Sequence, residues 1–262
     1  MAFAGYIGAF FIGLSLGLIG GGGSILTLPV LVYLFGVAPV PATSYSLFVV
    51  GSTSLFGAIN NWRQHLVDFR TALLFGVTSL ITVFITRKII IPAIPEVIPL
   101  GRLALHFSVL TMVLFAVLML AASLSMIRRP AGGPETPEQP AGTGKRVLYG
   151  VGIGLVTGLL GAGGGFLLIP ALVLLLRLPM KKAIGTSLLI IAMNSLVGFL
   201  GDAGHFRTNW TLLLSVTGLA VAGVFIGGVM GRLLEGRSLK KGFGWFVLAM
   251  GIYIIIREIL LQ

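Results

Sequence analysis

The sequence predicts an all-α integral membrane protein made of two inverted repeats, each a glycine-tipped helical hairpin, re-entrant or short, followed by three transmembrane helices. Two observations predict the membrane class. Hydrophobic residues make up 56% of the 262 positions and charged residues only 10%, whereas soluble domains carry roughly 25% charged residues. Apolar stretches of roughly 18 or more residues, long enough to cross a bilayer core, also recur along the chain. A third observation, an internal repeat, predicts the two halves.

The two halves are related by an offset of 141 residues. Residues 13–29 (GLSLGLIGGGGSILTLP) align without gaps with residues 154–170 (GLVTGLLGAGGGFLLIP), and nine of these seventeen positions are identical. The shared glycine spacing and the shared proline favour duplication over chance matching of apolar residues. We therefore expect one transmembrane domain with repeat 1 at 1–127, a Pro/Gly-rich linker at 128–146 and repeat 2 at 147–262.

Each repeat is expected to begin with a helical pair broken by glycines and to continue with three spans. In repeat 1 the pair covers about 3–20 and 24–36, and the spans cover about 42–60, 70–88 and 103–127. In repeat 2 the pair covers about 147–161 and 165–177, and the spans cover about 183–200, 209–231 and 242–261. The second arms hold about 13 residues, or roughly 20 Å of helix, which favours a re-entrant hairpin over a full crossing.

The odd number of crossings after each hairpin predicts that the second repeat is inverted relative to the first. With the central linker in the cytoplasm, thirteen of the eighteen Lys and Arg residues fall inside, as the positive-inside rule requires. Both termini are then outside, together with the five remaining basic residues: Arg87, Lys88, Arg102, Arg207 and Arg257.

The paired glycine runs are the strongest candidate for a binding site. Broken backbone at membrane depth is tolerated where it is buried in protein or lines a cavity, and matching interruptions in two repeats are typical of a transporter's substrate site. Amide groups at the start of each second arm carry the positive end of a helix dipole. Two tips meeting near the midplane could thus hold a small anion without a buried arginine. The predicted substrate-binding residues are Gly20, Gly21, Gly22, Gly23, Ser24, Gly161, Gly163, Gly164 and Gly165.

Glycines at such positions have a second explanation, because they also permit a tight turn and close contact between helices. Glycines at four-residue spacing elsewhere, such as Gly13 and Gly17, are expected to pack helices together in this way. Such stripes also permit a homodimer without requiring one.

Polar residues near span centres extend the candidate site. Thr53 and Asn194 occupy equivalent repeat positions, and Ser54 and Ser195 follow them. Polar groups at this depth need partners or water, so these four complete a substrate cradle or bond to a neighbouring helix.

Two residues near the end of a repeat 2 span are candidates for a gate or proton relay. They are Asp202 and His205, and the alternative is that both are solvated loop residues.

Other function classes lack their motifs. Cysteine is absent, no GxxxxGK[ST], HExxH or GxSxG occurs, and three scattered histidines form no metal motif. We therefore expect no enzyme activity, no metal and no cofactor. The net charge of +11 is spread over short gaps between apolar runs, so a lipid bilayer is the expected partner and nucleic acid is not. An anion channel using the same glycine tips stays open as an alternative, and a membrane-embedded enzyme is a weaker one.

The duplicated glycine hairpin, followed by a proline and then A-x-x-x-S-L at 42–47 and 183–188, resembles the TauE/SafE sulfite exporter family, also called the toluene sulfonate uptake permease family. The stretch GDAGHFRTNW at 201–210 is also similar to that family. The resemblance implies a secondary transporter of small sulfur-containing or organic anions in a bacterial inner membrane.

Overall fold

The computed structural model describes most of the chain. The described residues are 2–20, 23–95, 97–100, 103–128, 143–161, 164–165, 168–169, 172, 178–202, 208–233 and 236–260.

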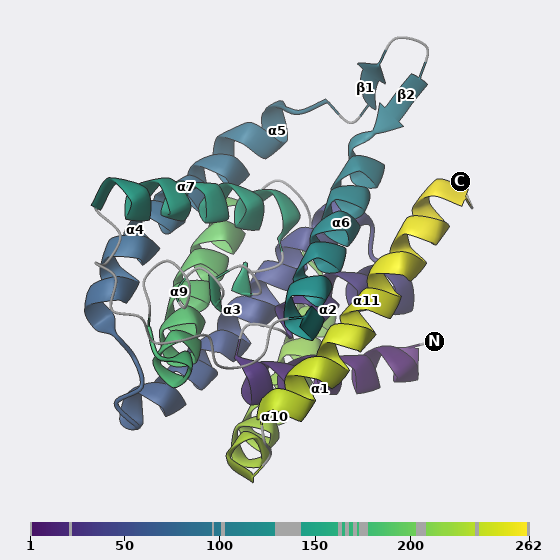
Figure 1. The fold of residues 1–262 in the computed structure, drawn as a ribbon. Coiled ribbons are helices and arrows are strands. Elements are labelled where there is room, and N and C mark those ends of the chain that lie inside the picture. The colour runs from purple at the N-terminus through teal and green to yellow at the C-terminus, as the bar shows by residue number, and fades with distance from the viewer. Residues whose placement is uncertain are drawn as a thin grey trace.

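Helices form nearly all of the described structure (Figure 1). Repeat 1 contains α1 (Ala2–Ile19), α2 (Ser24–Pro29), the π-helical turn η1 (Val30–Leu34), α3 (Pro39–Arg63), α4 (Phe69–Ile85), the π-helical turn η2 (Thr86–Ile90), α5 (Ile91–Ala93) and α6 (Phe107–Arg128). Repeat 2 contains α7 (Thr143–Leu160), α9 (Met180–Gly201), α10 (Trp210–Leu233) and α11 (Gly236–Leu260). The predicted helical class is confirmed, and the predicted spans correspond to these helices within a few residues at most ends.

One predicted span begins later than expected. The strands β1 (Val97–Leu100) and β2 (Leu103–His106) pair antiparallel in a short hairpin, so the helix expected from 103 starts at Phe107. Residues 129–142 of the expected linker, and most of the expected second arm at 165–177, lie outside the described residues.

Four of the described helices are long and apolar enough to cross a membrane. They are Pro39–Arg63, Phe69–Ala93, Lys181–Gly201 and Trp210–Met230. Large apolar side chains such as Leu73, Leu214 and Val229 stay exposed on the outside of this bundle. A surface of this kind is suited to lipid, so the chain is a multi-pass membrane protein.

The main helix contacts follow the same pattern in the two repeats. Helix α3 packs along α9, its counterpart in the other repeat, and α6 packs along α11 in the same way. Helix α1 packs on α10, and the counterparts of these two helices, α7 and α4, also pack on each other. Each repeat therefore supplies half of every major contact.

Glycines allow two of these helix pairs to touch through their backbones. A Cβ atom added to Gly13 of α1 would collide with the backbone of Ala220 in α10. One added to Gly154 of α7 would collide with the backbone of Ser79 in α4. Both contact pairs are related by the 141-residue offset, so the expected packing role of these small residues is confirmed.

Helices α3 and α9 run antiparallel. A Cβ atom on Gly57 would lie 3.2 Å from Leu188, and one on Gly198 would lie 3.1 Å from Leu47. Residue numbers thus rise along one helix as they fall along the other, and the same offset relates the two contacts.

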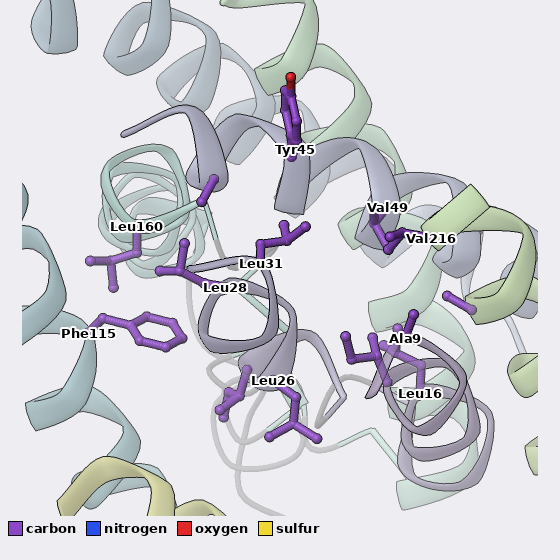
Figure 2. Close-up of a cluster of buried hydrophobic side chains, with 14 of the residues drawn as sticks. Ala9, Leu16, Leu26, Leu28, Leu31, Tyr45, Val49, Phe115, Leu160 and Val216 are labelled. Carbon is purple, nitrogen blue, oxygen red and sulfur yellow. The ribbon is translucent and has the colours of Figure 1, made fainter. Parts of the chain in front are cut away.

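The second arm of the first hairpin is enclosed by protein. All six residues of α2 are buried. Its Leu28 and the following Leu31 belong to a hydrophobic cluster with Tyr45, Phe115 and Leu160 (Figure 2). The described part of this second arm is therefore surrounded by protein and not by lipid.

Candidate functional site

The first glycine tip ends helix α1. Gly20 has a positive φ of 85°, a conformation that glycine adopts without strain, and its amide donates to the Leu16 carbonyl at 2.8 Å. A Cβ atom added to Gly20 would lie 2.5 Å from Cγ2 of Ile184, in the first turns of α9. Gly23 and Ser24, on the far side of the tip, are buried. We call this region tip 1.

The second glycine tip repeats the arrangement at the end of α7. Gly161 has a φ of 65°, and its amide donates to the Thr157 carbonyl at 2.9 Å. A Cβ atom on Gly161 would lie 2.5 Å from Cβ of Thr43, in the first turns of α3, and 2.7 Å from Nη2 of Arg87. Gly164 and Gly165 follow as buried residues. We call this region tip 2.

Four predicted site residues lie outside the described residues: Gly21, Gly22, Gly163 and His205.

The expectation that the two tips meet is wrong. Tip 2 lies on Thr43, near the start of α3, whereas tip 1 lies on Ile184, whose neighbour Gly185 approaches Asn61 near the end of α3. Thr43 and Asn61 are separated on one continuous helix by about 27 Å at 1.5 Å per residue. Each tip packs against the long helix of the opposite repeat, and the antiparallel course of α3 and α9 places these contacts at opposite ends of the pair.

A buried ion pair lies beside tip 2. Nη1 of Arg87 donates to Oδ2 of Asp202 at 3.0 Å and to Oγ1 of Thr43 at 2.9 Å, and the Arg87 and Asp202 side chains are 1% and 6% exposed. The alternative that Asp202 is a solvated loop residue is therefore wrong, and Arg87, counted among the basic residues on the outside, is buried in protein. Helical backbone continues past Ile85 through η2, and this continuation brings Arg87 against the end of α9. We call this end of the α3–α9 pair the charged end.

One feature of the sequence indicates this pair, although counting basic residues on each side of the membrane does not reveal it. Asp202 is one of only seven acidic residues in a strongly apolar chain. An acidic residue at the end of a span needs a partner there, and Arg87 ends a span that emerges on the same predicted side.

Among the described residues, the opposite end of the α3–α9 pair has no equivalent ion pair. Repeat 2 supplies Gly228 at the position equivalent to Arg87, and repeat 1 supplies Asn61 at the position equivalent to Asp202. The Asn61 side chain donates to the carbonyl of Gly57 in its own helix at 2.9 Å. We call this the neutral end.

Several buried polar atoms near tip 2 have no hydrogen-bond partner. They are Nε and Nη2 of Arg87 and Oγ1 of Thr157. Thr157 is 1% exposed, and its hydroxyl lies against the position that a Cβ atom on Gly164 would occupy. Buried donors in folded proteins are normally satisfied, so these three atoms are exceptions among the described residues.

The polar residues of the span centres lie between the two tips. The Thr53 hydroxyl donates to the carbonyl of Val49 in its own helix at 2.6 Å, and Nδ2 of Asn194 donates to Oγ of Ser79 in α4 at 2.5 Å. Bonding of Asn194 to a neighbouring helix is therefore confirmed. Oδ1 of Asn194 and the hydroxyls of Ser54 and Ser195 are buried without a partner.

The starts of α4 and α10 are held by matching bonds. Asp68 accepts from the amide of Thr71, and Asn209 accepts from the amide of Leu212. These side chains cap their helices. The backbone amides of Asp68 and Asn209 in turn donate to Thr186 and Tyr45 of the other repeat.

Comparison with known proteins identifies the family of this chain. Residues 6–254 match the family described as "Sulfite exporter TauE/SafE". A "Probable membrane transporter protein" of Xylella fastidiosa (strain 9a5c) is 33% identical over 258 residues, covering 94% of this chain and 92% of that protein. The "Probable membrane transporter protein YunE" of Bacillus subtilis (strain 168) is 27% identical over 246 residues, covering 86% and 85%. No solved structure matches the chain.

The family match spans nearly the whole chain, and the relatives cover both repeats. The chain is a membrane transporter that belongs to the TauE/SafE sulfite exporter family.

Proposed function

We propose that this protein is a secondary transporter that carries small sulfur-containing or organic anions, of the sulfite or sulfonate kind, across a bacterial inner membrane by alternating access. The family assignment supports the substrate class. The observation that carries the mechanism is the exchange of equivalent contacts between the repeats, with α3 and α9 antiparallel.

This exchange supports an inverted relation between the repeats. Two equivalent membrane-crossing helices that run antiparallel are related by an axis lying in the membrane plane. One repeat then presents to one side of the membrane what the other presents to the opposite side. Rocking of one repeat against the other would open the two ends in turn, as alternating access requires.

The placement of basic residues fits the same topology. Arg63 at the end of α3 and Lys181 at the start of α9 belong to the neutral end, which we assign to the cytoplasm together with the central linker. Arg87 and the start of α3 belong to the charged end, which we assign to the outside with both termini.

The buried ion pair is suited to a gate. Arg87 links η2 through Asp202 to the end of α9, and through Thr43 to the start of α3. Opening the charged end between these elements requires at least one of the two hydrogen bonds to break. We assign the gate to Asp202 with Arg87. We also propose that His205 belongs to this gate or to a proton relay with Asp202.

The substrate path runs between the tips. It includes the described tip residues Gly20, Gly23, Ser24, Gly161, Gly164 and Gly165, and the central residues Thr53, Ser54, Asn194 and Ser195. The unpartnered hydroxyls of Ser54 and Ser195 support this path, because they are donors that a passing anion would meet.

Counterflow in vesicles tests the proposal. Purified protein is reconstituted into liposomes loaded with unlabelled sulfite, and uptake of radiolabelled sulfite is measured with protein-free liposomes as the control. A transporter gives saturable uptake that internal sulfite accelerates and returns the anion chemically unchanged. Uptake that follows an imposed voltage without saturation would instead establish the channel, and absence of flux for sulfite, thiosulfate and short sulfonates would contradict the substrate class.

A further inference from the structure

We infer that the free edge of the Arg87 guanidinium, together with the Thr157 hydroxyl, is the oxyanion-binding site of the transporter, and that it lies at tip 2 alone. The inference rests on the proposed function and deepens it by naming the residues that recognise the substrate.

The guanidinium of Arg87 is divided into a used side and a free edge. Nη1 is occupied by Asp202 and Thr43, whereas Nε and Nη2 have no partner. Nε and Nη2 lie along one edge of the planar group, and their N–H bonds point the same way. This fork matches two oxygens of a carboxylate, sulfonate or sulfite, the bidentate arrangement that makes arginine selective for oxyanions.

The glycine at tip 2 allows the backbone to lie close against this edge without a side chain between them. A Cβ atom on Gly161 would lie 2.7 Å from Nη2 of Arg87, closer than a side chain can approach without displacing it. The partnerless Thr157 hydroxyl lies one helical turn before Gly161 and supplies a further neutral donor from the same tip. The Thr157 hydroxyl thus adds a donor to the free edge of Arg87 without a second cation.

The ion pair with Asp202 holds the guanidinium for this purpose. A buried arginine without any partner is costly, and the carboxylate compensates its charge while the site is empty. Asp202 lies on the Nη1 side, so the free edge stays available, and its repulsion of an arriving anion keeps binding weak enough for release. Because Arg87 is only 1% exposed, the anion reaches it when tip 2 separates from the start of α3.

The neutral end lacks every charged member of this set. Its equivalents of Arg87, Asp202, Thr43 and Thr157 are Gly228, Asn61, Ile184 and Leu16. Among these equivalent positions, an arginine that could bind an anion therefore occurs at the charged end and not at the neutral end.

The test measures sulfite binding by thermal shift and by titration calorimetry on purified protein in neutral detergent. The decisive variant is Arg87→Lys, which retains a cation for Asp202 but lacks the pair of parallel N–H donors that binds two oxygens. The charge-neutral double variant Arg87→Gln/Asp202→Asn guards against misfolding of a protein with one unpaired buried charge. Lys88→Gln is the matched control, since it removes a basic charge from the next, exposed residue.

Sulfite is expected to raise the melting temperature of the wild type and of Lys88→Gln equally. Binding by Arg87→Lys should be about tenfold weaker or more, because a bidentate charge-assisted contact becomes a single one. The double variant should show no sulfite-specific shift. Phosphatidylglycerol, added as an alternative source of an oxyanion, should produce no shift that depends on Arg87.

Three other results would overturn different parts of the account. Equal sulfite binding by all folded variants, with sulfite counterflow intact in wild type, would reject the Arg87 site and leave the proposed function standing. Absence of both binding and counterflow in wild type would reject the proposed substrate class and the site with it. A lipid-dependent shift that needs Arg87 would assign the edge to a lipid headgroup and contradict the inference.

Discussion

The charged end and the neutral end of the α3–α9 pair occupy equivalent places in the two repeats but differ in chemistry. At the charged end, a glycine tip adjoins a buried ion pair with free guanidinium donors. At the neutral end, the equivalent tip packs on Ile184, and Asn61 bonds within its own helix. The glycine contacts are the same in the two repeats, whereas the buried ion pair lies at positions where the two repeats differ in sequence.

The largest expected difference between the two ends comes from removing their polar anchors. Asp202→Ala leaves Arg87 buried without its counter-charge and should lower the free energy of unfolding by about 3–5 kcal/mol. Asn61→Ala removes one partly buried hydrogen bond and should lower it by about 1 kcal/mol. Denaturant unfolding in detergent micelles measures both, and equal losses would erase the distinction between the ends.

The second-largest difference is expected between alanine substitutions at the two tip glycines. Alanine at either Gly20 or Gly161 must adopt a positive φ, which costs about 1–2 kcal/mol. At Gly161 the added methyl group also meets backbone and Cβ of Thr43, whereas at Gly20 it meets the Ile184 side chain, which can rotate. Gly161→Ala should therefore be the more destabilised by melting temperature. A greater loss for Gly20→Ala would show that tip 1 is the more tightly packed.

Removing either of the two equivalent helix caps should lower the free energy of unfolding by the same amount, so the caps serve as a reference for the differences above. Asp68→Ala and Asn209→Ala each remove one capping hydrogen bond at equivalent positions and should each cost about 1 kcal/mol. Clearly different losses of unfolding free energy for the two variants would show that the repeats differ also at these equivalent helix starts.

The smallest effect on stability is expected at Thr157. Its hydroxyl has no partner, so Thr157→Val should change the free energy of unfolding by less than about 1 kcal/mol. Sulfite affinity should nevertheless fall several-fold, since a charge-free donor is lost. Thr82→Val, whose hydroxyl bonds within its own helix, is the control and should bind sulfite normally.

Much of the fold was predictable because the physical signals were local. Apolar runs of membrane length and paired glycine breaks placed the helices, and the repeat offset linked Gly13 with Gly154. The structure then used these residues in matching contacts with Ala220 and Ser79. Asn194 was also identified correctly as a polar residue needing a partner at its depth.

The errors arose where tertiary packing overrides local patterns. Counting basic residues by membrane side treats each as solvated, and so it missed the burial of Arg87 against Asp202. The glycine runs predicted two tips but not which helix each tip would pack against. Their separation follows from the contacts with Thr43 and Ile184, which no spacing in the sequence encodes.

The central claim is that the charged and neutral ends face opposite sides of the membrane. The chain contains no cysteine, so single Ala38→Cys and Lys181→Cys variants place one label site at the start of each long helix. We expect an impermeant maleimide added to intact cells to label Cys at 38, and to label Cys at 181 only after the membrane is opened. Labelling of both positions from the same side would contradict the inverted arrangement and with it the account of the two ends.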